Sequence, residues 1–240
     1  GSTLVHACGG AAALAGIIVL GAREGRFGKR GEKKSMQPFA ASSIPLVTLG
    51  TFLLWFGWFG FNGFSQLAMG TFDDVNAISK IAVNTHLAGA AGTVTGAALT
   101  RLIGGKTDII MMLNGALAGL VAITAEPLTP GPITAMIIGS IGAVIMYYGT
   151  KMLENLGLDD VVGAIPVHMF AGIFGTLVVP FTNSDTSFGT QFIGVISVCV
   201  FSFALSWITF SSLKSTVGLR ISKAAEKQGT DKAEVGVIAY

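Results

Sequence analysis

Hydrophobic residues follow one another along this chain in seven long blocks, which short polar segments separate. Most of the blocks approach the ~20 residues that an α-helix needs to cross a bilayer. Lipid offers no partner to an open strand or an unpaired backbone group, so we expect each block to be a helix. The pattern predicts an all-α, polytopic transmembrane helical bundle over residues 1–213 and a tail over residues 214–240. The predicted spans are residues 3–22, 44–67, 78–100, 109–125, 132–149, 161–181 and 192–213.

Composition excludes a soluble globular protein. Charged residues make up 12% of the chain, about half the ~25% that is usual in soluble proteins. The 33 glycines among 240 residues are about twice the average usage of ~7%, as expected where helix backbones approach closely in lipid. Gly57, Gly60 and Gly63 recur every three residues, which predicts a closely packed neighbouring helix on that side of the second block.

The basic residues predict the orientation of the chain in the membrane. Residues 23–34 hold six of the fifteen lysines and arginines, which marks this segment as cytoplasmic. Seven crossings then place fourteen of the fifteen on that side and leave only Lys80 outside. We therefore expect a multi-pass protein of the cell membrane with an outer N-terminus and a cytoplasmic tail. The net charge of +2 follows this topology, so it does not indicate a nucleic-acid partner.

Two of the three histidines share a local pattern. His6 and His168 each follow a valine and precede a glycine, Gly10 or Gly172, by four residues. They lie in the first and sixth blocks, which cross in opposite directions, as in an inverted-topology repeat with its site at the repeat interface. Two imidazoles meeting near the midplane can take a proton from a small cation while a neutral species moves on. The alternative for a single buried histidine is a neutral ring hydrogen-bonded to a neighbouring helix.

Metal and enzyme chemistry fit the sequence less well. Neither His6 nor His168 has an acidic residue beside it at helical spacing, and Cys8 is only two residues from His6, so no metal site is predicted. Cys8 and Cys199 lie inside apolar blocks and build no disulfide framework. The serines occur in no Gly-x-Ser-x-Gly setting, which argues against an intramembrane enzyme. We expect neither a cofactor nor catalysis.

The second block carries an aromatic run near its outer end. Phe61 and Ser65 are four residues apart and share a helix face. An aromatic ring and a hydroxyl there can hold a small cation by cation–π attraction and hydrogen bonding. Trp58 is also free to face this side, whereas an interfacial aromatic belt is the alternative reading for Trp55 and Phe64.

Three further polar features are interpreted as structural. His86 has no repeat partner and stands beside an asparagine and a threonine, which favours a hydrogen-bonded structural role. Asp159 and Asp160 stand at the start of the sixth block, where carboxylates cap free N–H groups and complement the helix dipole. Pro166 removes a backbone hydrogen bond, which predicts a kink beside His168.

On these residues the chain resembles the ammonium transporter family (Amt, methylammonium permease and Rhesus proteins), and its bacterial Amt branch in particular. The matching motifs are collinear over nearly the whole chain. They are Gly1-Ser-Thr-Leu-Val-His6, Phe56-Gly-Trp-Phe-Gly-Phe-Asn-Gly-Phe-Ser65, Val83-Asn-Thr85, Leu158-Asp-Asp160 with Val167-His168, and Thr216-Val-Gly-Leu-Arg220 with a terminal Ala239-Tyr240.

The resemblance implies a homotrimer in which each subunit has its own narrow hydrophobic pore. It implies eleven helices, the first ten in two inverted repeats, with the first block here as the fifth helix, so that most of the first repeat precedes this chain. By the same resemblance His6 and His168 are the pore histidines, Phe61 is a gating aromatic, Trp58 lines the pore and Ser65 belongs to the outer ammonium recruitment site.

The expected function is passage of ammonium or ammonia, with methylammonium as a further possible substrate. The alternative is an ammonium-binding sensor or structural subunit without sustained transport. A PII-type regulator at the cytoplasmic face is a further partner that the family implies. Two departures bear on these expectations. Gly163 replaces an acidic residue that many bacterial members carry five positions before the second pore histidine, and the tail lacks their His-Gly-Glu run before Ala239-Tyr240.

Overall fold

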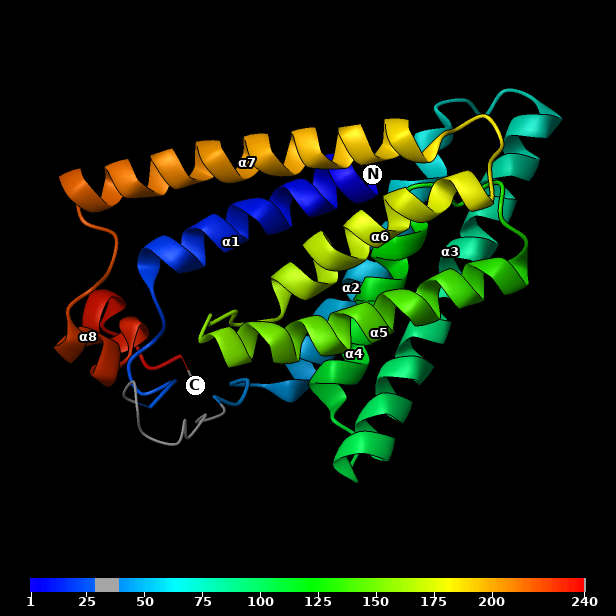
Figure 1. The fold of residues 1–240 in the computed structure, drawn as a ribbon. Coiled ribbons are helices and arrows are strands. Elements are labelled where there is room, and N and C mark those ends of the chain that lie inside the picture. The colour runs from blue at the N-terminus through cyan, green and yellow to red at the C-terminus, as the bar shows by residue number, and fades with distance from the viewer. Residues whose placement is uncertain (29–38, 240) are drawn as a thin grey trace.

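The computed structural model describes residues 1–28 and 39–239, and the described residues form helices, turns and loops without a strand. The all-α prediction is thus confirmed for this part of the chain. Each of the seven hydrophobic blocks contains one long helix or a run of contiguous helical segments (Figure 1). In chain order these are η1 (Ser2–Ala7), α1 (Cys8–Leu20), α2 (Ile44–Gly63), η2 (Phe64–Gln66), α3 (Phe72–Gly104), α4 (Ile109–Ile123), α5 (Pro132–Leu156), η3 (Ile165–Phe170), α6 (Ala171–Val178), η4 (Val179–Phe181), α7 (Phe188–Thr216), α8 (Lys223–Gln228) and η5 (Asp231–Val235).

Helix α3 is longer than the predicted span 78–100. It begins at Phe72, because the Thr71 hydroxyl accepts a hydrogen bond from Asp74 N–H while the Asp74 carboxylate accepts one from Thr71 N–H. It ends at Gly104, and the following residue, Gly105, has a φ of +76°, which suits glycine. The first turns of α3 carry acidic and basic residues, so they lie outside the hydrophobic block although they belong to the helix.

Four helical stretches are long and apolar enough to cross a membrane by length and composition: Ser2–Leu20, Ile44–Gln66, Pro132–Leu156 and Phe188–Thr216. Ile109–Ile123 and Ile165–Phe181 are apolar but shorter. Helix α4, with 15 residues, is about 22 Å long. Much of α2 and α7 is exposed and apolar, as expected of helices that face lipid or a partner inside a membrane.

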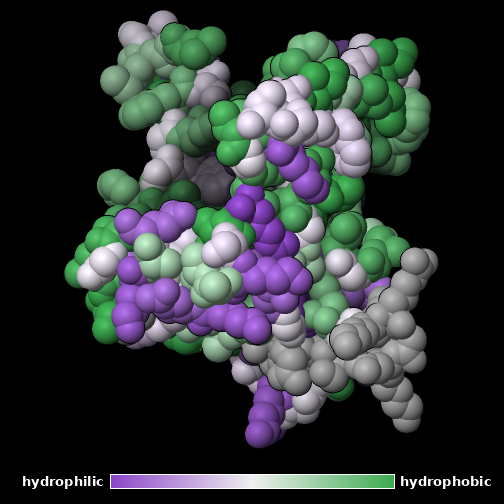
Figure 2. Space-filling model, turned by 90° about the vertical axis from the view of Figure 1, so that its left-hand side faces the viewer, coloured by the Kyte–Doolittle hydropathy of each residue, from purple (hydrophilic) through white to green (hydrophobic). Residues whose placement is uncertain are grey.

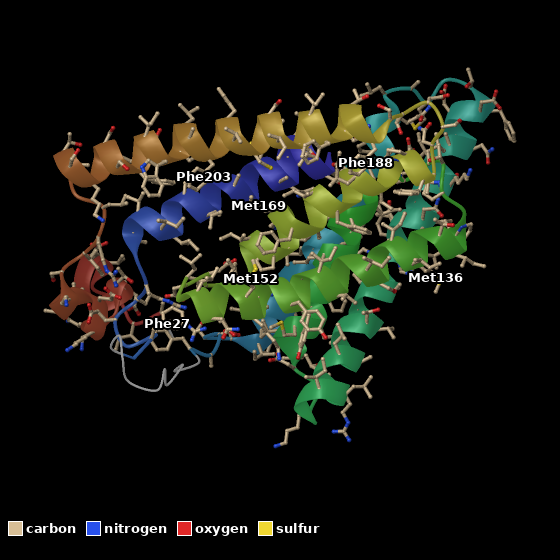
Figure 3. The ribbon with its side chains drawn as sticks, viewed as in Figure 1. Phe27, Met136, Met152, Met169, Phe188 and Phe203 are labelled. Atoms are coloured by element: carbon tan, nitrogen blue, oxygen red, sulfur yellow. The ribbon has the colours of Figure 1, made fainter. Side chains whose placement is uncertain are left out.

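The helices form two groups that meet at α6 and η3. Helices α3, α4 and α5 pack on one another, while α1 lies alongside α7, as Figure 1 shows. Ala7 and Ala11 pack against Val195 and Cys199 of α7, and Met169 and Phe203, labelled in Figure 3, lie against this cluster. The two groups are therefore joined through the helices that carry His6 and His168.

Helices α1, α3, α5 and α7 finish at one end of the bundle, which we call the tail-side end. There Lys214 Nζ donates to the carbonyl oxygen of Val19 over 2.6 Å, and Arg26 Nη2 lies 2.8 Å from Glu154 Oε1. Figure 2 looks onto this end and shows hydrophilic residues gathered on it, with hydrophobic residues around them. The opposite end, where η1 begins and α2 finishes, is called the outer end.

Close backbone contact in this bundle comes from glycines on α3, α4 and α5. A Cβ added at Gly92 would collide with the backbone of Gly115, and one added at Gly139 would collide with the backbone of Ala88. The sequence predicted such a contact at Gly57, Gly60 and Gly63 of α2, but these glycines do not make one with any described residue. A Cβ at Gly57 would meet no atom within 4 Å, and Cβ atoms at Gly60 and Gly63 would make only ordinary contacts with a side chain. Close approach needs small residues on both helices, and among the described residues no glycine or alanine faces these three positions of α2.

We expect Gly92→Ala to destabilise the protein by about 1–3 kcal/mol, because the new methyl group overpacks the α3–α4 contact. The matched control is Gly57→Ala, which adds the same methyl group in open space and replaces a flexible helical glycine, a change that stabilises a helix by about 0.5–1 kcal/mol. The midpoint of thermal unfolding in detergent should fall for the first variant and hold or rise for the second. Equal midpoints for both variants would contradict the packing assignment.

Candidate functional site

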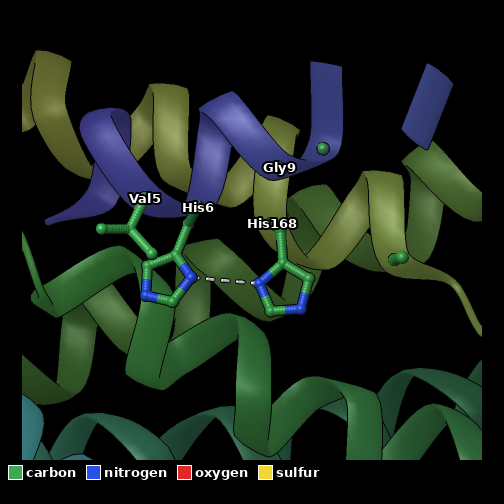
Figure 4. Close-up of a pocket in the computed structure, with 6 residues that line it drawn as sticks. Val5, His6, Gly9 and His168 are labelled. Carbon is green, nitrogen blue, oxygen red and sulfur yellow. Dashed lines mark hydrogen bonds between the residues drawn. The ribbon is translucent and has the colours of Figure 1, made fainter. Parts of the chain in front are cut away.

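His6 and His168 lie in two π-helical segments, η1 and η3, each of which continues into an α-helix. Their Nδ1 atoms are 3.2 Å apart, and the rings are nearly parallel, with centroids 5.2 Å apart at 15° (Figure 4). A neutral imidazole has one donor and one acceptor nitrogen, so one ring donates its Nδ1–H to the other. Both rings then keep their Nε2 atoms for other partners, and Nε2 of His6 is buried without a hydrogen-bond partner among the described residues.

Two glycine contacts set the spacing of the rings. A Cβ added at Gly10 would lie 2.5 Å from the Cβ of Met169, and one added at Gly172 would collide with the carbonyl oxygen of Ser2. Gly10 follows His6 by four residues and Gly172 follows His168 by four residues. Each helix therefore presents a glycine to the segment that carries the other histidine, which gives the repeated pattern in the sequence a physical meaning.

The sequence predicted a kink beside His168 at Pro166, and the structure has a π-helical segment there. Pro166 is at the start of η3, where its missing N–H disturbs the backbone ladder least. Segment η1 has the same π geometry without a proline, so proline alone does not account for it. Single π turns occur often at functional sites, because the extra residue redirects a side chain.

Aromatic rings extend the histidine pair towards the outer end. The Trp58 indole stacks on the His6 imidazole with centroids 4.9 Å apart at 14°, and the Phe61 ring lies 5.5 Å from the same imidazole. Trp58 Nε1 donates to Thr124 Oγ1 over 2.8 Å, which fixes the indole against α4. Trp58 is buried, whereas Phe61 is 40% exposed. The structure thus brings together His6, His168, Trp58 and Phe61.

Ser65 lies one helical turn beyond Phe61, in η2 at the outer end. Its hydroxyl donates to the carbonyl oxygen of Phe61 over 2.7 Å, and the side chain is exposed. The proton of the hydroxyl is therefore engaged, and only the oxygen lone pairs remain for a ligand. A hydroxyl held in this way suits a ligand that donates hydrogen bonds.

A cavity of about 310 Å³ adjoins the histidine pair. Its lining includes Gly9 and Gly10, which follow His6 along α1, and Ala164, which precedes His168. Helix α1 runs towards the tail-side end and η3 runs away from it, so the cavity lies on the tail side of the two rings. Ser65, Phe61, the two imidazoles and the cavity therefore succeed one another from the outer end towards the tail-side end.

The two predicted capping carboxylates have different roles. Asp160 accepts hydrogen bonds from the N–H groups of Gly163, Ala164 and Ile165, which begin the sixth helical stretch. Asp159 is not a cap. Its carboxylate accepts hydrogen bonds from the backbone N–H, Nε and Nη2 of Arg23, and it lies 3.5 Å from Arg26 Nε. The arginines were not linked to it in sequence, because more than 130 residues separate them.

The charge of Asp159 depends on those arginines. Burial disfavours its ionised form, but the hydrogen bonds of Arg23 and the charges of Arg23 and Arg26 together outweigh burial and lower the pKa of Asp159. A lowered folded-state pKa contributes stability above the unfolded pKa, and this contribution is lost as the pH falls through the folded pKa. The ion pair thus holds the α1 end to the start of η3 throughout the neutral range.

The remaining residues named in the sequence analysis are His86, Gly163, the basic segment and the terminal tyrosine. His86 is exposed, and its ring lies 5.4 Å from Trp55 and 6.2 Å from Phe59, so the expected hydrogen-bonded role is not seen among the described residues. Gly163, which replaces an acidic residue, has a φ of +76° that favours glycine. Residues 29–34, which are half of the basic segment 23–34, and the terminal Tyr240 lie outside the described residues.

Several positioning residues were not identified from the sequence. Thr124 anchors Trp58, Ser2 Oγ donates to the carbonyl oxygen of Val121 over 2.7 Å, and the hydroxyls of Thr3 and Thr176 are 2.5 Å apart. Small hydroxyl residues are common in membrane helices, so nothing in their local pattern marks them. Only the chain-distant partners show that they hold η1 in place.

The chain is similar to known proteins over its whole length. A profile described as the Ammonium Transporter Family matches residues 1–240. Ammonium transporter Amt2 of Archaeoglobus fulgidus is 40% identical over 100% of this chain and 54% of its own length, and a putative ammonium transporter of Synechocystis is 38% identical over 98% and 53%. The chain thus spans about half the length of the curated relatives it matches.

Solved structures show the same fold. A structure titled Sensor Amt Protein superposes with a TM-score of 0.89 at 34% identity, covering 98% of this chain and 59% of the other. The crystal structure of Candida albicans Mep2 superposes with a TM-score of 0.79 at 26% identity, covering 92% and 51%. With matching motifs, fold and family profile along its whole length, this chain belongs to the ammonium transporter family.

Proposed function

We propose that this chain carries ammonium across a cell membrane as ammonia and a separately handled proton. The observation that carries the proposal is the hydrogen-bonded pair of His6 and His168 between an aromatic ring and a cavity. The names of the relatives support the choice of ammonium as substrate. Methylammonium, a slightly larger donor of the same kind, is a second candidate substrate.

Capture occurs at the outer end in this proposal. Ammonium has N–H donors and no acceptor, which matches the free lone pairs of Ser65. The rings of Phe61 and Trp58 offer cation–π attraction to the same ion. A whole cation is costly to move further into apolar surroundings, so ammonium gives up a proton beside Phe61. Nε2 of His6, which has no hydrogen-bond partner among the described residues, accepts this proton, and the nitrogen moves on as ammonia.

Ammonia then meets the two imidazoles. Nε2 of His6 is buried and has no hydrogen-bond partner in the part of the chain that the structure describes, so it is available to a small molecule with both donor and acceptor character. The Nδ1–Nδ1 hydrogen bond couples the two tautomers, which allows a proton to be passed from one ring to the other. Beyond them the cavity lined by Gly9, Gly10 and Ala164 leads towards the tail-side end.

We also propose an orientation in the membrane and the partners of the protein. Of the described lysines and arginines, all but Lys80 lie towards the tail-side end, so this end is assigned to the cytoplasm by the positive-inside rule. The exposed apolar faces of α2 and α7 suit lipid and the neighbouring subunits of a homotrimer. A PII-type regulator remains a candidate partner at the cytoplasmic face, although the family's His-Gly-Glu run is absent from the tail.

A sensor that binds ammonium without sustained transport is the second candidate. The structural relative titled Sensor Amt Protein favours it, because its fold matches this chain with a TM-score of 0.89. Measurements on liposomes that contain the chain distinguish transport from sensing. A saturable current elicited by ammonium, and absent with sodium or potassium, supports transport, whereas ammonium binding by calorimetry without current supports the sensor.

We expect His6→Ala and His168→Ala each to lower ammonium-specific flux by about a hundredfold or more, because each removes one member of the proton relay. The matched control is His86→Ala, which removes the third histidine outside the pair and should leave the flux unchanged. Flux is measured in liposomes with equal amounts of folded protein. Normal ammonium-specific flux in the double variant His6→Ala/His168→Ala would rule out the relay.

We expect Gly172→Ala to separate the two imidazoles, because its methyl group would collide with the carbonyl oxygen of Ser2. The hydrogen-bonded Nδ1 signals in ¹⁵N NMR should be lost, and ammonium-specific flux should fall with them. Gly194→Ala in α7 is the control, since a Cβ there meets no atom within 4 Å. Unchanged histidine signals in a folded Gly172→Ala variant would show that the contact between Gly172 and Ser2 does not set the spacing of the two rings.

A further inference from the structure

The two cysteines of the chain, Cys8 and Cys199, lie at the contact between α1 and α7. Cys8 is the first residue of α1, and its Sγ lies 2.7 Å from Ser202 Oγ on α7. Cys199 precedes Ser202 by three residues, so both side chains are on the same face of α7. The two thiols are therefore neighbours, close enough to interact electrostatically. Nothing in the proposed transport path uses them.

The surroundings of the two thiols are mainly apolar. Cys199 is buried in a hydrophobic cluster, and Met169 and Phe203, both labelled in Figure 3, pack against this cluster. Cys8 is half-buried, so it is the more accessible of the two thiols. An ionised thiol is costly in such surroundings unless a cation offsets its charge. A ligand that replaces both thiol protons must therefore leave no net charge behind.

The small number of ligands limits the kind of metal ion that can bind. Within residues 1–28 and 39–239, no group of three or more histidine, cysteine, aspartate or glutamate side chains is placed to hold a metal ion. Zinc, calcium and magnesium need more ligands than two thiols provide. Sulfur ligands suit soft ions, and Cu(I), Ag(I) and Hg(II) are soft ions that accept two ligands in a line. With two thiolates the monovalent ions leave an anion, whereas Hg(II) gives a neutral complex.

We propose that Cys8 and Cys199 bind one Hg(II) ion between α1 and α7. Mercuric chloride is a neutral molecule, so it reaches the half-buried Cys8 without the cost of carrying a charge into apolar surroundings. Two Hg–Cl bonds break and two Hg–S bonds form. The two thiol protons and the two chloride ions leave to water, and no atom is oxidised or reduced. Because α1 continues from η1, which carries His6, the bound ion ties this segment to α7.

The test is titration of the detergent-solubilised chain with mercuric chloride, followed by the ultraviolet absorption of mercury–thiolate bonds. We expect one equivalent of mercury to complete the absorption change and to block both thiols from alkylation by a maleimide. Cys8→Ser and Cys199→Ala each leave one thiol. These variants should release mercury to glutathione at concentrations about a hundredfold lower than the unchanged protein needs, because the second bond is no longer intramolecular. Binding of one mercury on each thiol of the unchanged protein would overturn the bridge.

Ser202→Ala is the matched control, because it removes the hydroxyl beside Cys8 and keeps both thiols. We expect one equivalent of mercury to block both thiols in this variant as well. Loss of the bridge in folded Ser202→Ala would contradict the assignment of the two thiols as the complete ligand set. Size-exclusion chromatography of the mercury-loaded protein should show the same assembly as without mercury. Mercury-dependent association of the protein would place the bridge between molecules and would overturn the site within one chain.

Discussion

The close approach of two backbones at Gly10 and Gly172 is the contact on which the rest of this site depends. Histidine side chains are short, so two imidazoles from separate helices reach hydrogen-bond distance only where the helices nearly touch. The structure meets this condition twice, with Gly10 against Met169 and Gly172 against Ser2. Hydrogen bonds from Ser2 to α4 and from Thr3 to Thr176 hold η1 against that crossing.

The tightly packed helices α3, α4 and α5 support the two segments that meet at Gly10 and Gly172. Its helices meet through glycine and alanine backbones, as at Gly92 with Gly115 and Gly139 with Ala88. Dense packing of this kind leaves little freedom to α4, and α4 carries Thr124, which anchors the Trp58 indole. The indole in turn stacks on His6. The position of the imidazole is thereby tied to the most tightly packed part of the bundle.

The sequence predicted what depends on local pattern and missed what depends on partners. Hydrophobic blocks of membrane length, and a Val-His pair with a glycine four residues later, are visible in one dimension. The close contact predicted at Gly57 is not seen among the described residues, because a glycine becomes a contact only when a small residue faces it. Asp159 was read as a cap for the same reason, since its arginine partners lie more than 130 residues away. The outer turns of α3 were hidden by their charged residues.

Asp159 and Asp160 connect the tail-side end to the position of the histidine pair, because they make different contacts. Asp160 caps the N–H groups that begin η3, while Asp159 binds Arg23 just after α1. Since the two carboxylates are adjacent, the start of η3 is fixed to the end of α1 at one point. The crossing at Gly10 and Gly172 fixes the same two helical stretches at another point. Two separated attachments prevent rotation of one stretch about the other, so the ion pair at the surface helps to keep His6 and His168 in register within the membrane.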